Sequence, residues 1–90
     1  MDYEELADFF KLFTNINRIK IVMALAKKSM NVAQIEEEID ISQSLVSQSL
    51  KHLKQARIVT SVRSGKQVIY SLYDNHIVEI LESVLAHSKE

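Results

Sequence analysis

Four side chains in the last seventeen residues have the types and spacing of a divided metal site. They are Asp74, His76, His87 and Glu90. On a helix, the 11-residue step between the two histidines gives them nearly a common direction but separates them by about 16 Å along the axis, so one chain cannot bring both to one ion. If two copies of the helix cross antiparallel near residue 82, Asp74 and His76 of one chain face His87 and Glu90 of the other, twice per dimer.

Two imidazoles and two carboxylates form a suitable tetrahedral shell for Zn(II), with Co(II) as the nearest alternative. All four positions are then filled by protein and none is left for water, which disfavours a zinc hydrolase, and no other nucleophile–base pair is visible. We therefore expect no enzyme. The sequence has no cysteine, which excludes thiolate metal sites and disulfides. The alternative reading is that the four residues are incidental polar groups, with Asp74 favouring the positive end of a helix dipole.

A second group of side chains has the chemistry of DNA recognition. Residues 41–73 carry five basic residues and no acid, whereas residues 1–40 carry eight acids and five bases, and residues 74–90 four acids and one base. Such an acid-free block indicates contact with a polyanion. Short polar side chains in it can reach base edges, and its basic ones can bind phosphates. The residues expected to contact DNA are Gln43, Ser44, Ser47, Gln48, Lys51, Lys54, Arg63 and Lys66.

Two other interpretations of this block remain open at this point. It could be an ordinary solvated face, or part of a fold used only for protein contacts, which a steep salt dependence of duplex binding would rule out. The third histidine, His52, has no acidic or imidazole partner in the pattern, and we expect it on the helix surface or facing a phosphate.

The periodicity of apolar residues predicts four helices before and within this block. A first helix covers residues 3–13, with an apolar stripe that includes Phe9 and Phe10. Asn15 is a suitable cap for a second helix, and Asn31 with a glutamine three residues later predicts a capping box for a third. Ser42 is the expected cap of the fourth helix. The side chains expected to face inward on that helix are Leu45, Val46, Leu50 and Leu53.

After the fourth helix the period changes to that of strands. Residues 58–62 and 67–72 are rich in β-branched residues and flank the turn 63–66, where Gly65 can adopt a positive φ. Helical spacing returns from Asp74 to about His87. The prediction is a mainly α protein with a small β-hairpin: one winged helix-turn-helix domain over residues 1–90, in the order ααααββα. The longest apolar run is too short for a membrane helix and the first residues are acidic, so we expect a cytoplasmic protein with no membrane contact.

Three segments resemble the ArsR/SmtB family of metal-sensor repressors. Residues 41–54, ISQSLVSQSLKHLK, are similar to the recognition helix of that family; residues 17–21, NRIKI, to its Arg-containing second helix; and residues 65–72, GKQVIYSL, to its wing. The resemblance extends over residues 5–90. The chain departs from the family pattern at Asn15 and Ile16, where Asp-Pro is usual, and at Arg57, where Gly is common.

The resemblance implies a function as well as a fold. Members of the family are homodimers on inverted-repeat operators, and the four residues of the divided site match the zinc ligands on the family's fifth helix. We therefore expect a metal-free homodimer, formed through the first and last helices, that binds double-stranded operator DNA. Zn(II), with Co(II) as the alternative ion, would bind between the subunits, lower the affinity for DNA and derepress metal-homeostasis genes. No small organic substrate is expected. The alternative is a repressor of the same family that responds to another signal or to none.

Overall fold

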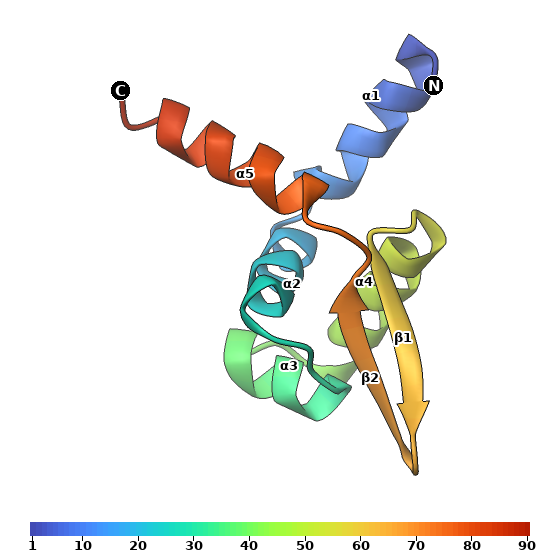
Figure 1. Cartoon of the computed structure of the whole chain (residues 1–90). Helices are drawn as coiled ribbons and strands as arrows, with labels where there is room; N and C mark the ends of the chain where they lie inside the picture. The colour runs from blue at the N-terminus through green and yellow to red at the C-terminus, as the bar shows by residue number, and fades with distance from the viewer.

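The computed structural model describes residues 1–90 and has the predicted order of elements (Figure 1). A short 3-10 turn, η1, follows the first helix. The elements are α1 (Tyr3–Lys11), η1 (Leu12–Thr14), α2 (Ile16–Lys27), α3 (Val32–Ile39), α4 (Gln43–Gln55), β1 (Val59–Ser64), β2 (Gln67–Leu72) and α5 (His76–His87). The predicted winged helix-turn-helix fold is confirmed.

Polar caps start three of the helices at the predicted residues. The Asn15 side chain accepts hydrogen bonds from two backbone N–H groups of α2, at 2.9 and 3.3 Å. Asn31 and Gln34 form a reciprocal capping box at the start of α3, with both bonds 2.8 Å long. The Ser42 hydroxyl accepts the Leu45 N–H at 3.3 Å at the start of α4. These bonds satisfy donors that a helix leaves free at its first turn.

The first predicted helix is shorter than expected. Regular α-helix ends at Lys11, and Phe13 has φ −103° and ψ 17°, outside the helical region. The next residue but one, Asn15, must be extended (φ −111°, ψ 117°) to cap α2, so α1 cannot run into it. The predicted helix over residues 3–13 is therefore α1 followed by the 3-10 turn.

The hairpin is also tighter than predicted. Val59 pairs with Leu72 at one end and Ser64 with Gln67 at the other, so β1 continues two residues past the predicted end of the strand. Gly65, with φ 63°, lies in the two-residue connection. Two residues other than glycine also have left-handed φ: Asp40 (54°) after α3, and Arg57 (58°) after α4. Arg57 is the position where the family commonly has Gly, and the backbone there has the conformation that favours Gly.

The core lies where α2, α3, α4, the start of β1 and the first turn of α5 meet. Its buried apolar residues are Ile21, Val22, Ala24, Leu25, Met30, Ile35, Val46, Leu50, Leu53, Ile58, Val59, Ile77 and Val78. The prediction that Leu45 faces inward was wrong, because its side chain is 42% exposed. Leu45 lies about 100° around the helix from Val46, whereas Leu50 and Leu53 lie within about 40° of Val46. The buried stripe of α4 is thus too narrow to include Leu45.

α1 and α5, which we call the outer helices, project from the same end of the molecule (Figure 1). α1 contributes no buried residue, and α5 contributes only Ile77 and Val78. The tip of the hairpin lies at the opposite end of the molecule (Figure 1). None of the helices combines the length and apolar character that crossing a bilayer demands.

Candidate DNA interface and metal centre

The helix α4 presents a polar face to solvent. Ser44, Ser47, Gln48 and Lys51 are exposed and lie on the sides of the helix that face away from the buried Val46. All eight residues expected to contact DNA are exposed, including Gln43 and Lys54 on α4 and Arg63 and Lys66 on the hairpin. The chain's own fold therefore leaves the whole set exposed to solvent, where an external partner can reach it.

Lys54 differs from the other basic residues of the set in having a partner within the chain. Its Nζ donates a hydrogen bond to Ser61 Oγ of β1 at 2.7 Å. This bond joins the last turn of α4 to the hairpin, whereas Arg63 and Lys66 lie beside the turn of the hairpin. Lys54 can thus hold the hairpin against α4 in addition to offering positive charge.

His52 is less exposed than expected from the sequence, and it has a partner within the chain. Its side chain is half-buried, and Nδ1 lies 3.2 Å from Nη2 of Arg18 on α2. A guanidinium can only donate, so Nδ1 accepts in this bond. Arg18 Nε is buried and has no hydrogen-bond partner. Sequence reasoning missed the pair because its two members are 34 residues apart and no periodicity connects them.

The first half of the divided site is assembled at the start of α5. Asp74 Oδ1 accepts the backbone N–H of His76 at 3.0 Å, and its Oδ2 lies 3.3 Å from His76 Nδ1. One carboxylate oxygen therefore favours the helix start while the other faces the imidazole. Asp74 has the structural role of the alternative interpretation, and this role leaves one of its oxygens available.

The second half is assembled at the other end of α5. His87 Nδ1 lies 3.4 Å from Glu90 Oε2, and the backbone N–H of Glu90 donates to the carbonyl of His87 at 3.1 Å. Both histidines have more than four-fifths of their side-chain surface exposed. Within one chain no three histidine, aspartate or glutamate side chains gather closely enough to hold a metal, so each end of α5 offers a pair of donors.

The spacing of the donor atoms in each pair is compatible with zinc. Neighbouring ligand atoms lie about 3.3–3.4 Å apart in a tetrahedral site whose ligand distances are about 2.0–2.1 Å. The two N···O distances in the chain are 3.3 and 3.4 Å. A charge-assisted hydrogen bond between the same groups is shorter, about 2.7–2.9 Å. Each pair can therefore supply one edge of a tetrahedral ZnN₂O₂ site.

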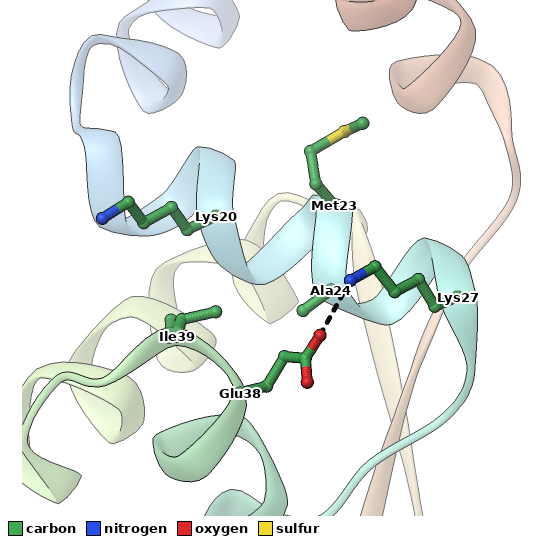
Figure 2. Close-up of a pocket in the computed structure, with 6 residues that line it drawn as sticks. All are labelled: Lys20, Met23, Ala24, Lys27, Glu38 and Ile39. Atoms are coloured by element: carbon green, nitrogen blue, oxygen red, sulfur yellow. Dashed lines mark hydrogen bonds and ion pairs between the residues drawn. The ribbon is translucent and has the colours of Figure 1, made fainter.

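A groove of about 320 Å³ lies between α2 and α3, away from the expected site residues. Lys27 Nζ donates to Glu38 Oε1 across it at 2.8 Å (Figure 2). This bond, together with the positive charge of Lys27, lowers the pKa of the Glu38 carboxyl. In Figure 2 the side chains of Lys20 and Met23 point away from this ion pair in different directions. The lining residues do not converge on a common point, and the ion pair joins α3 to α2.

Comparison with known proteins places these features in a family. Residues 15–61, just over half of the chain, match the bacterial regulatory protein, arsR family. The chain is 32% identical over 87 residues to a transcriptional repressor SmtB homolog from Synechocystis sp., and 41% identical over 73 residues to the HTH-type transcriptional repressor SmtB of Mycobacterium tuberculosis. The alignments span 97% and 81% of this chain but 66% and 54% of those proteins. A cadmium resistance transcriptional regulatory protein, CadC, from Listeria innocua is 34% identical, with 90% of this chain and 69% of that protein aligned.

Solved structures have the same fold. The crystal structure of the Mycobacterium tuberculosis protein Rv0081 aligns with 96% of this chain and 90% of its own, with a TM-score of 0.86 and 31% identity. A homodimeric winged helix-turn-helix DNA-binding domain from Mycobacterium bovis aligns with 97% of this chain and 81% of its own, with a TM-score of 0.83 and 22% identity. The relatives described above are transcriptional regulators and not enzymes.

Proposed function

This chain belongs to the ArsR family of bacterial regulatory proteins, and we propose that it is a zinc-responsive transcriptional repressor that acts as a homodimer. Its SmtB relatives are repressors, and the CadC relative is a regulator of cadmium resistance, which supports metal sensing in general. The chain spans two-thirds or less of the two SmtB relatives. The proposal for zinc therefore depends on this chain's own residues.

The observation that carries the DNA-binding role is the exposed, acid-free surface of α4 and the hairpin. We call residues 41–73 the reading unit. The polar side chains of α4 are suited to base edges in the major groove, because glutamine offers a donor and an acceptor and serine can act as either. Lys51, Arg63 and Lys66 are suited to phosphates, and Lys54 can contribute charge while bound to Ser61. Binding of the two reading units of a dimer to an inverted repeat follows from twofold symmetry.

The outer helices support dimerisation. Phe10 on α1 and Ile80, Val84 and Leu85 on α5 are 40–60% exposed in the single chain. Apolar side chains gathered at one end of a monomer indicate a protein interface. We propose that a second copy covers this surface, with the two α5 helices crossing antiparallel near residue 82.

The crossing brings the two donor pairs of α5 to each other. Asp74 and His76 of one protomer and His87 and Glu90 of its partner would then hold one Zn(II). The set related to it by the twofold axis would hold a second. When bound, the ion supplies a tie between the two α5 helices. The 3.3 and 3.4 Å spacings within the pairs support this assignment. We also propose that the operator is an inverted repeat and that the genes under its control serve metal homeostasis.

Coupling between the two functions passes through the dimer. Val78 and Ile77 of α5 are part of the core that also contains Leu50 and Leu53 of α4, so a reading unit follows the orientation of its α5 helix. A change in the crossing of the α5 helices alters the distance between the two reading units, and only one distance fits the operator. Couplings of this kind are about 1–3 kcal/mol, or about 5- to 150-fold in affinity.

The test is an anisotropy titration of a fluorescent operator duplex, selected in vitro with metal-free protein, in the presence and absence of Zn(II). Zinc should weaken binding of the wild type by about 5- to 150-fold. His76→Ala and His87→Ala should bind DNA as the wild type does and ignore zinc. Glu79→Gln, which removes an unpaired carboxylate from the same helix, should keep the response.

Equal affinity with and without Zn(II) would overturn the zinc-responsive mechanism. The remaining interpretation would be a repressor of this family that responds to another signal or to none. Asp74 would then serve only to accept the backbone hydrogen bond at the start of α5. Absence of any salt-dependent duplex binding would overturn the DNA-binding role as well.

A further inference from the structure

Leu45 is the one exposed apolar side chain on α4. The other large apolar side chains of that helix, Val46, Leu50 and Leu53, are all buried, whereas Leu45 is 42% exposed. It is also absent from the partly buried apolar residues that pack against the core. The fold therefore gives Leu45 no apolar partner sufficient to cover it.

The neighbours of Leu45 belong to the polar face of the reading unit. Leu45 lies in the first turn of α4, next to Ser44 and one helical turn before Gln48. Side chains three positions apart on a helix are separated by about 5–6 Å at Cβ, so Leu45 and Gln48 can reach the same or adjacent base pairs. The outer helices, which expose the apolar surface assigned to the dimer, are separate elements at the other end of the domain from α3 (Figure 1).

We propose that Leu45 determines part of the operator sequence by packing against the C5-methyl group of a thymine in the major groove. This inference rests on the proposed DNA-binding role of the reading unit. The thymine methyl is the one apolar group that a base pair presents in the major groove, and apolar side chains recognise it by contact. Leu45 supplies the matching apolar surface among side chains that otherwise offer only hydrogen bonds. The thymine lies in, or next to, the base pair that Gln48 contacts.

The test deletes the methyl group from the DNA rather than from the protein. Each thymine of a selected half-site is replaced in turn by deoxyuridine, which keeps base pairing and removes only the methyl group. At one position the substitution should weaken wild-type binding by about fourfold to tenfold. This is the size of effect expected when the buried contact of one methyl group is lost. Leu45→Ala should weaken binding to the thymine duplex by at least as much and should bind thymine and deoxyuridine duplexes equally at that position.

Lys51→Ala is the matched control on the same helix. Loss of a phosphate contact lowers affinity evenly across sequences, so this variant should bind more weakly and keep the full preference for thymine. Because the substitution in the DNA needs no variant, the wild-type arm tests the inference even if Leu45→Ala is poorly folded.

Failure of the inference is distinguishable from failure of the proposed function. If the wild type binds the selected duplex and no thymine methyl contributes, or if Leu45→Ala keeps the preference, the inference is overturned and the DNA-binding role stands. If Leu45→Ala instead dissociates the dimer in sedimentation, Leu45 is a protein contact and the inference is also overturned. If the wild type selects no duplex at all, the proposed function itself fails.

Discussion

The reading unit and the outer helices differ in how much of their structure one chain can complete. In the reading unit, apolar residues of α4 and β1 are buried in the core, and Lys54 joins α4 to the hairpin. On the outer helices, Phe10 and Val84 remain exposed, and the donors of α5 are separated into two pairs. Under the proposed function, one chain thus contains a complete surface for DNA and half of each proposed metal site. We therefore propose that the response to metal arises at the contact between two chains.

The largest expected effect follows from separating the two chains. Val84→Asp with Phe10→Asp places charges in the apolar surface of the outer helices and should give a folded monomer. Loss of two-point attachment should weaken operator binding by about 100-fold or more. Sedimentation measures the oligomeric state, circular dichroism shows that the variant is folded, and anisotropy measures its affinity for the operator. Glu79→Asp on the polar side of α5 is the control, and a monomer that keeps wild-type DNA affinity would remove the distinction between the two regions.

A change in the finished region should act on stability instead. Leu50 is 1% exposed, and Leu50→Ala should lower the free energy of unfolding by about 2–5 kcal/mol because it leaves a cavity in the core. Urea unfolding at a fixed protein concentration measures this loss. Ser47→Ala, on the exposed side of the same helix, should stay within about 0.5 kcal/mol of the wild type. If Leu50→Ala lowered the free energy of unfolding no more than the control does, the placement of Leu50 in the core would be contradicted.

The metal ligands should affect only communication between the regions. His87→Ala should remove the effect of Zn(II) on operator binding, an energy of about 1–3 kcal/mol, and leave the affinity of the metal-free protein unchanged. By reciprocity, operator DNA should weaken zinc binding to the wild type by the same factor. Competition with a chelating dye, with and without the duplex, measures this. Zinc affinity that is indifferent to DNA would separate the metal site from DNA binding.

The smallest predicted effect concerns the backbone between α4 and the hairpin. Arg57 has φ 58°, a conformation that costs a side chain with Cβ about 1 kcal/mol and glycine much less. Arg57→Gly should therefore raise the free energy of unfolding by up to about 1 kcal/mol. Lys51→Gly, inside α4, should lower it by about the same amount. A loss of stability in Arg57→Gly would show that the arginine side chain makes a contact worth more than the backbone cost.

Local signals in the sequence were sufficient for most of the fold. Asn15, Asn31 and Ser42 each begin a helix because their side chains satisfy free backbone donors, and this chemistry can be recognised from residue type alone. Gly65 similarly marked the hairpin, although pairing of Ser64 with Gln67 extended β1 beyond the predicted strand. The pairing of Asp74 with His76 and of His87 with Glu90 agrees with their spacing in the sequence.

What the sequence did not predict depends on contacts between distant elements. Apolar spacing placed Leu45 on the inner side of α4, but the width of the buried stripe depends on how α2 and α3 pack against that helix. His52 is hydrogen-bonded to Arg18, which is 34 residues away in the sequence, and nothing in the type of either residue predicts the other as its partner. Assembly of the four metal-binding side chains also depends on contacts outside the helix, in this case with a second chain. The four-ligand site therefore remains a prediction from spacing and symmetry.

The most direct test of that prediction mixes two defective proteins. His76→Ala and His87→Ala each remove a ligand from both sites of their own homodimers, so neither should bind Zn(II) tightly. In a mixed dimer one site carries both changes, and the other combines an intact Asp74–His76 pair with an intact His87–Glu90 pair. After subunit exchange of equal amounts, verified by native mass spectrometry, half the dimers are mixed and tight binding should return to about one Zn(II) per four chains. Complete exchange with no recovery of tight zinc binding would contradict a site shared between two α5 helices.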